Sequence, residues 1–282
     1  MDFLKFSQFC LYLYRLHNIF TSVDVPITKK YLKPVRKIYL PLSFVCLLFS
    51  FLLLPVVKAG KVTASGKFIS IHVPSETTGE NGISAVEYAT NILYDSLNLG
   101  RLGLSKEALL YAYKGQKNLA RKGKLNNSDI LTVCDFTQPS DSKRMYIIDV
   151  SNFKVLLNTY VAHGKNSGLY YAEKFSNNPR SLKSSLGFYI TKNVYNGKHG
   201  MSLKLSGEDR GFNDNAEERA VVIHGAKYIG CPGGAVAGRS FGCPAVPQKV
   251  ASRVINLIKG GSCLFIYHPS KTYLHGSKVL NG

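Results

Sequence analysis

Residues 221–246 carry the sequence VVIHGAKYIGCPGGAVAGRSFGCPAV, which decides the fold and the chemistry that we expect. The β-branched run from Arg219 to His224 predicts a strand that ends at a histidine, after which Gly225 opens a loop. Further along, Cys243 lies in a turn between small residues. A histidine placed 19 residues before a cysteine favours a base and a nucleophile over two unrelated structural residues.

Each residue type in this pattern has a chemical reason. A free thiol has a pKa of about 8.5, so an adjacent imidazole is needed to take its proton and later return it to a leaving amine. Gly242 has no Cβ, so the backbone can approach a reacting carbonyl and its N–H groups can stabilise the oxyanion. Ser240 can hydrogen-bond locally and hold the loop. The sequence therefore predicts Cys243 as the nucleophile and His224 as its base.

The rest of the second half of the chain reads as a mainly β domain. Short β-rich runs separated by turn clusters predict further strands at residues 130–136, 145–150, 155–162, 188–194 and 263–267. Residues 247–259 place apolar side chains on one face and predict a C-terminal helix, which Gly260 ends. We assign residues 123–282 to this catalytic domain.

An α-helical hairpin is expected over residues 84–122, before the β domain. Ser84 and Glu87 form a capping-box pattern, and apolar residues follow at helical spacing. Ser105 can cap a second helix that runs to about Arg121. The preceding residues 60–83 are polar and read as a linker.

Residues 1–59 read as an export leader. Residues 38–57 form an apolar run without a charged side chain, and basic residues precede it. This length suits a signal-peptide core or a membrane anchor. The basic flank predicts that the chain after the run lies outside the cytoplasm, in the periplasm or cell envelope. Cleavage and anchoring in the inner membrane both stay open, and residues 1–37 have no assigned role.

The net charge and the spacing of the cysteines limit the classes of binding partner and metal site that we expect. The formal net charge of +19 favours anionic polymers, but no nucleic-acid motif or aromatic-interleaved basic stripe is present, so we expect no nucleic-acid partner. The four cysteines after the leader show no CxxC spacing, which argues against a metal site. Cys134 and Cys263 lie in apolar runs and are expected to be buried and inert, whereas the state of Cys231 is open.

These motifs resemble the L,D-transpeptidase catalytic domain, also called YkuD-like, and most closely the branch described as murein L,D-transpeptidase catalytic domain. The resemblance starts from His224-Gly225 and Ser240-x-Gly242-Cys243. It extends over roughly residues 84–269 and includes five further segments, Val161–Gly164, Phe175–Asn177, Ser184–Tyr189, Gly197–Gly200 and Arg210–Asn213.

The resemblance implies a cysteine acyltransferase that acts on peptidoglycan stem peptides. Cys243 would attack the carbonyl of the third residue, diaminopimelate, of a stem tetrapeptide and release D-alanine. The thioester would then pass to the side-chain amine of a second stem, which gives a 3→3 cross-link. The resemblance also implies no metal and no organic cofactor, a Gly225 carbonyl that orients His224, and acylation of Cys243 by carbapenems.

Two positions depart from the pattern of much of the wider family. Phe241 stands where histidine is common, and Ala245 stands where an arginine is common. A group that would anchor the substrate carboxylate is therefore missing from its expected place, and Arg239 is the nearest substitute. His163 and His199 both precede glycines, so we expect them in turns. The candidate substrate-binding residues are Ser240, Arg239, His163 and His199.

Three other functions stay open. A wall peptide hydrolase would pass the acyl group to water. A sortase-like transpeptidase also places histidine before cysteine, but with wider spacing and an arginine shortly after the cysteine, for which Arg253 is the candidate. An inactive cell-wall-binding module would keep the fold without a reactive thiol. A papain-like enzyme is disfavoured because its cysteine precedes its histidine.

Overall fold

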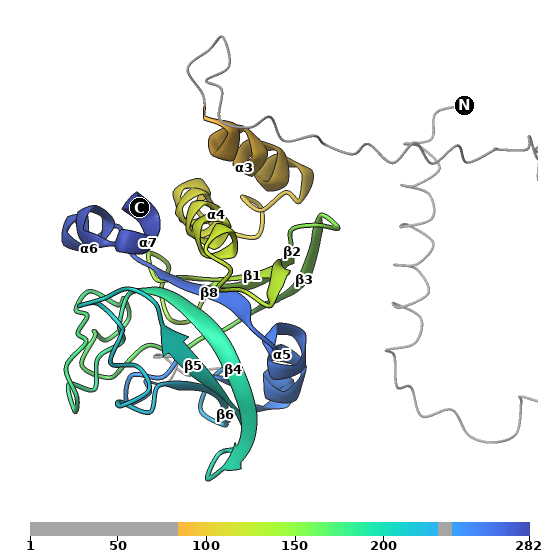
Figure 1. The fold of residues 1–282 in the computed structure, drawn as a ribbon. Coiled ribbons are helices and arrows are strands. Elements are labelled where there is room, and N and C mark those ends of the chain that lie inside the picture. Colours follow the sequence, from red (N-terminus) through yellow and green to blue (C-terminus); the bar gives the residue numbers. More distant parts are fainter. Residues whose placement is uncertain (1–83, 231–238) are drawn as a thin grey trace, which may run out of the picture. The chain divides into compact units, whose positions relative to one another are not determined.

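The computed structural model describes residues 84–230 and 239–282. The described chain begins with two helices, α3 (Ala85–Ser96) and α4 (Lys106–Arg121), at the places that the capping signals predict (Figure 1). Ser84 and Ser105 cap them, because each hydroxyl oxygen accepts the backbone N–H three residues later at 3.2 Å. These two helices are the expected hairpin.

A single sheet of eight strands forms the centre of the fold, in the order β3-β2-β1-β8-β4-β5-β6-β7. Neighbouring strands are antiparallel except for β1 with β8 and β6 with β7, which are parallel. The strands are β1 (Asn127–Asp135), β2 (Met145–Asp149), β3 (Lys154–Thr159), β4 (Gly187–Gly197), β5 (Gly200–Gly207), β6 (Val222–Ala226), β7 (Val246–Pro247) and β8 (Ser262–Tyr267). The mainly β domain expected from the sequence is therefore confirmed.

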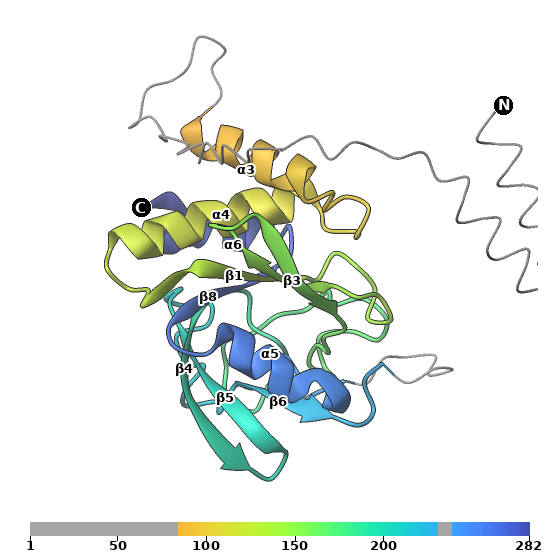
Figure 2. The same ribbon diagram turned by 90° about the vertical axis from the view of Figure 1, so that its right-hand side faces the viewer.

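Helices cover both faces of the sheet. Helix α4 packs on β1 and β8 on one side, and α5 (Ala251–Ile258), which follows the 3-10 turn Gln248–Val250, lies on the other (Figure 2). Two short helices end the chain, α6 (Lys271–Gly276) and α7 (Lys278–Asn281). Helix α7 is tied to α4, because the side-chain amide of Asn118 donates to the Val279 carbonyl at 2.8 Å.

The structure differs from the sequence expectations in three places. Strand β5 was not expected, because its glycine, serine and lysine content hides the β pattern. The predicted strand 219–224 begins only at Val222, because residues 210–220 form turns and Ala220 has a φ of +51°. Helices α6 and α7 were missed because both are short.

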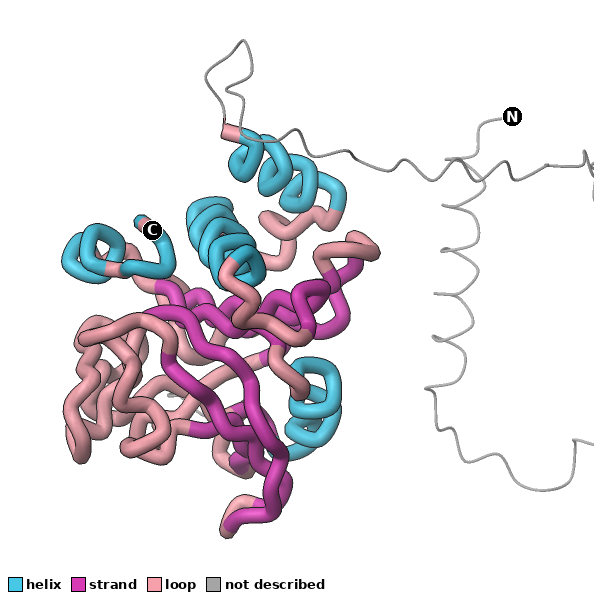
Figure 3. Tube along the Cα trace, viewed as in Figure 1, coloured by secondary structure: helices cyan, strands magenta, loops and turns pink. Residues whose placement is uncertain are grey.

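Two long connections, residues 160–186 and 208–221, gather on one side of the sheet (Figure 3). Hydrogen bonds hold them together, since the backbone N–H of Asn215 donates to the side-chain oxygen of Asn177 at 3.1 Å. Asp209 is fully buried and accepts from the Phe188 N–H, the Tyr273 hydroxyl and the Ser277 hydroxyl. This carboxylate therefore joins the 208–221 connection to β4, α6 and α7.

The expected leader 1–59 and linker 60–83 lie outside the described residues, and so does Cys231. The apolar run 38–57 falls in the same part of the chain. Within the described ranges, no helix is both long enough and apolar enough to cross a membrane.

A close approach of α4 to the sheet yields a stability prediction. A Cβ on Gly115 would overlap the ring of Phe188, and this ring is buried and stacks on Phe265 with centroids 4.1 Å apart. Gly115→Ala should lower the free energy of unfolding by about 1–3 kcal/mol, which outweighs the gain of about 1 kcal/mol from helix propensity. Chemical denaturation measures this change.

A double-mutant cycle identifies the cause of that loss. In a Phe188→Leu background the ring is absent, so Gly115→Ala should cost less than it does in the wild type. An equal cost in both backgrounds would show that the collision with Phe188 is not the reason.

Candidate active site

His224 lies on β6, opposite Ser202 of β5, and only 6% of its surface is exposed. Its Nδ1 is 3.0 Å from the carbonyl oxygen of Gly225. A carbonyl can only accept, so Nδ1 carries the proton and donates it, which leaves Nε2 with a free lone pair. The Gly225 carbonyl is therefore placed where the family resemblance expects an orienting group.

Two neighbouring residues, His199 and Lys198, favour the neutral form of this imidazole. His199, from the turn between β4 and β5, stacks on His224 with ring centroids 4.3 Å apart and planes 19° apart. Burial lowers the pKa of His224, the hydrogen bond to Gly225 raises it, and His199 and Lys198 lower it further, with a net shift downward. A neutral imidazole at neutral pH is the state that a general base requires.

Cys243 is half-buried in the loop that precedes β7. Its Sγ donates to the Ala220 carbonyl at 3.6 Å. Burial raises the pKa of the Cys243 thiol, and the Val222 N–H, Arg219 and Lys198 offset only part of this rise. The thiol is therefore mainly protonated in the free protein and needs a base.

Cys243 contacts the backbone at the start of the strand that carries His224. Ala220 and Val222 contact the sulfur, and His224 follows on the same strand. Lys198 acts electrostatically on both Cys243 and His224. The structure shows no hydrogen bond between the two side chains, which is common for catalytic pairs before a substrate binds.

Ser240 organises the loop that carries the nucleophile. Its Oγ accepts from the Gly242 N–H at 3.0 Å and donates to the Cys243 carbonyl at 2.6 Å. Its own backbone pairs with His163 and Lys165. Only 3% of its surface is exposed, and these contacts match the loop-holding role expected of Ser240, whereas its expected contact with a substrate stays a prediction.

Gly242 is required by a close approach of the chain. Its φ is +123°, and a Cβ there would lie 2.9 Å from the carbonyl oxygen of Lys183. The glycine was expected to admit a substrate carbonyl, and in the structure it admits this protein carbonyl. The N–H of Cys243 donates to no acceptor among residues 84–230 and 239–282, so it is free to bind an oxyanion.

His163 does not reach the active site surface. It is fully buried, and its Nδ1 lies 2.8 Å from an Arg144 nitrogen while its Nε2 lies 3.2 Å from the Gly168 carbonyl. Arg144 can only donate, so Nδ1 is the acceptor and Nε2 carries the proton. The expectation that His163 positions the substrate is therefore wrong, because both ring nitrogens are used inside the core.

The loop residues beside the nucleophile differ in accessibility. Phe241 is 68% exposed, and the Lys165 ammonium lies 4.9 Å from the centre of its ring. Arg239 is exposed as well. Ala245 is fully buried and packs with Ala162 and Ile229. A longer side chain at position 245 would have no room there, so this position cannot supply a carboxylate anchor.

Arg219 is the functional candidate that the sequence reasoning missed. Its guanidinium donates to the carbonyls of Ser176 and Lys183 at 2.8 and 2.7 Å, and to the hydroxyls of Ser181 and Ser185. A Cβ on Gly242 would be 3.3 Å from its Nη2. All four acceptors are uncharged, so the arginine places a cation beside the nucleophile loop without a carboxylate partner.

The remaining cysteines behave as structural residues. Cys134 and Cys263 are free and fully buried, as expected from their apolar runs. Burial raises the pKa of Cys134 to about 12, and it raises the pKa of Cys263 as well. Among the described residues, no group of three histidine, cysteine or acidic side chains is arranged to hold a metal ion.

Protonation of His163 should affect stability in acid. Burial, with the charge of Arg144, lowers its pKa from about 6.5 to about 4. Between these values the unfolded chain binds a proton that the folded chain does not, so stability is full above about pH 6.5 and falls as pH drops toward 4. His163→Gln should remove this part of the pH dependence of the free energy of unfolding.

The control for this prediction is His275→Gln, which makes the same change at an exposed histidine. It should leave the slope of the wild type intact. If His163→Gln also kept the full slope between pH 6.5 and 4, another group would be responsible.

Removing the charge of Arg219 should make Cys243 less reactive. The guanidinium lowers the pKa of the thiol, so Arg219→Met should raise that pKa and slow alkylation by iodoacetamide at pH 7. Arg219→Lys keeps the charge and should stay closer to the wild-type rate. Arg210→Met is the matched control on an exposed arginine of the same connection. Equal rates for wild type and Arg219→Met would contradict the assignment.

Comparison with known proteins supports the family that the motifs indicate. The sequence profile of the L,D-transpeptidase catalytic domain matches residues 101–267, more than half of the chain. No curated protein sequence matches the chain.

Solved L,D-transpeptidases are similar to the chain at low sequence identity. One from Mycobacterium smegmatis is 12% identical, with a TM-score of 0.32, over 50% of this chain and 59% of that chain. L,D-transpeptidase 1 from Mycobacterium tuberculosis is 11% identical, with a TM-score of 0.28, over 50% and 62%. Residues 123–326 of the enzyme from Xylanimonas cellulosilytica are 13% identical, with a TM-score of 0.27, over 69% and 99%.

The chain thus spans less than two thirds of the two mycobacterial chains. On the strength of the profile match, this chain belongs to the L,D-transpeptidase catalytic-domain family.

Proposed function

We propose that this protein is a peptidoglycan L,D-transpeptidase that works through a thioester on Cys243. The observation that carries the proposal is the arrangement at the start of β6. There the backbone of residues 220–222 contacts Sγ, and the Gly225 carbonyl fixes the His224 tautomer with Nε2 free. Membership of the family supports peptidoglycan stem peptides as the substrate.

In the acylation step, Nε2 of His224 takes the proton of the Cys243 thiol while Sγ attacks the carbonyl of the third stem residue. The N–H of Cys243 donates to the resulting oxyanion. The imidazolium then gives its proton to the amine of the departing D-alanine as the C–N bond breaks. One thioester forms, one amide is broken, and His224 is neutral again.

In the transfer step, the side-chain amine of a second stem attacks the thioester. His224 takes a proton from the attacking amine, and Sγ leaves as a thiolate that recovers this proton. The products are a 3→3 cross-link and the free enzyme. The pKa of His224 is lowered by burial, so the imidazole is available as a base in both steps at neutral pH.

The sortase-like alternative has no support in the geometry. Arg253, its candidate arginine, lies on α5 and donates to the Leu156 carbonyl on β3 at 3.3 Å. It therefore contacts the far strand of the sheet instead of the thiol. Arg219 is the arginine whose charge acts on Cys243.

Three substitutions test the mechanism. Cys243→Ala and His224→Ala should each abolish acylation, and the double variant should be little worse than either, because base and nucleophile act as a unit. Ser240→Ala removes loop hydrogen bonds and should slow acylation by up to roughly tenfold. Intact-protein mass after incubation with a carbapenem, and D-alanine release from a tetrapeptide, measure the rates.

His275→Ala is the matched control for His224→Ala and should acylate at the wild-type rate. Circular dichroism checks that each variant is folded. A folded His224→Ala protein with near wild-type acylation would assign the base to another group, with His199 as the nearest imidazole.

A further inference from the structure

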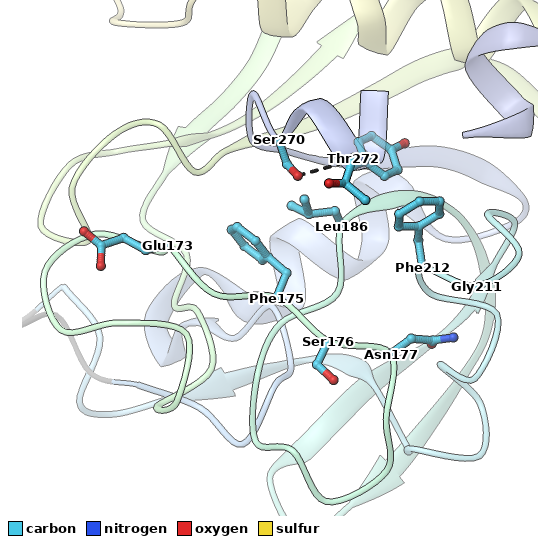
Figure 4. A pocket seen from close by; sticks show the side chains of 10 residues that line it. Glu173, Phe175, Ser176, Asn177, Leu186, Gly211, Phe212, Ser270 and Thr272 are labelled. Carbon is cyan, nitrogen blue, oxygen red and sulfur yellow. Dashed lines mark hydrogen bonds between the residues drawn. The ribbon is translucent and has the colours of Figure 1, made fainter. Parts of the chain in front are cut away.

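A pocket with a volume of about 310 Å³, whose lining does not include Cys243, lies between residues 173–177, residues 211–212 and the start of α6 (Figure 4). Phe175, Leu186 and Phe212 form its apolar wall, with Ser270 and Thr272 beside them. Its volume is at the lower end of the ~300–1,000 Å³ typical of small-molecule pockets, which suits a single ring.

The aromatic side chains of this pocket are held in place. Phe175 packs on His268 with ring centroids 5.0 Å apart. Phe212 meets Tyr273 edge to face, with centroids 5.2 Å apart and planes at 90°. The Tyr273 hydroxyl in turn donates to the buried Asp209 at 2.9 Å. The pocket is therefore largely preformed, and a ligand would not have to order its walls.

One side chain connects this pocket to the candidate active site. Ser176 lines the pocket, and its carbonyl accepts from Nη1 of Arg219 at 2.8 Å. The other terminal nitrogen of Arg219 lies beside Gly242, next to the nucleophile. The pocket and the Cys243 loop therefore flank the same guanidinium, so a substrate that acylated Cys243 and also reached the pocket would pass Arg219.

The side chains that line the pocket indicate which chemical class of ligand fits it. Phenyl and leucine side chains match the C–H faces of a pyranose ring, and the Ser270 and Thr272 hydroxyls match its hydroxyl groups. The lining includes no lysine or arginine, although the chain carries a net charge of +19. An anionic ligand such as a phosphate is therefore a poor match.

We propose that this pocket binds a sugar ring of the glycan strand to which a donor stem peptide is attached. The proposal rests on the proposed function, since a stem peptide reaches the enzyme with its amino sugar linked to it. The pocket would then select glycan-borne stems over free peptides.

A blocking variant tests the pocket with little effect on the fold. Thr272 is exposed on α6, so Thr272→Tyr should fill the pocket, and Lys271→Tyr is the matched control at the neighbouring exposed position outside it. Acylation kinetics are compared for a free tetrapeptide and for the same tetrapeptide on its N-acetylated disaccharide. The wild type should have a KM roughly tenfold lower for the disaccharide donor.

Thr272→Tyr should remove this advantage and leave the kinetics of the free tetrapeptide unchanged, whereas Lys271→Tyr should keep the advantage. Equal KM values for both donors in the wild type would overturn the proposal. A Thr272→Tyr variant that weakens both donors equally would also overturn it, because the pocket would then hold peptide.

Calorimetry with the peptide-free disaccharide separates this proposal from the proposed function. The Cys243→Ala protein should bind the disaccharide, and Thr272→Tyr in that background should abolish binding. Binding that depends on Thr272 would support the sugar site even if no stem peptide acylated Cys243. An enzyme that is acylated by tetrapeptide but binds no disaccharide would keep the function and lose the sugar site.

Discussion

The guanidinium of Arg219 is the contact on which the arrangement around the nucleophile depends. It donates to four uncharged acceptors in residues 176–185, a segment that has no regular secondary structure to hold it. One of these acceptors, the Lys183 carbonyl, lies so close to Gly242 that only a glycine fits there. Hydrogen bonds from a charged donor are stronger than neutral ones, so a single arginine can fix a long connection against the catalytic loop.

Strand β6 of the sheet carries His224, the other residue of the candidate pair. Ala220, just before β6, and Val222, its first residue, contact the sulfur, and His224 follows two residues later on the strand. The catalytic loop is held separately, because Ser240 pairs with the 163–165 backbone and bonds both Gly242 and Cys243. Cys243 and His224 are therefore held by separate parts of the fold, the first by the Ser240 hydrogen bonds and the second by strand β6.

The sequence identified the parts of this protein that carry local signals. The β-branched runs became strands, the serine caps became helix starts, and Cys243 lies against the backbone at the start of the strand that carries His224. Arg219 carried no such signal, because its partners lie about 40 residues earlier in the chain and meet it only after folding. No sequence signal indicated that His163 is buried either, because its hydrogen-bond partner Arg144 comes from a different part of the fold.

The position of Arg219 also explains how the loop can do without an arginine after the cysteine. Ala245 is buried against Ala162 and Ile229, so the loop turns inward where the wider family often has a charged side chain. Arg219 lies beside Gly242, next to Cys243, and the four acceptors to which it donates are all uncharged. A cation in this place lowers the pKa of the thiol. The positive charge beside the thiol therefore comes from the 208–221 connection, and the exposed Phe241 lies on the surface of the loop, where the Lys165 ammonium is 4.9 Å from its ring.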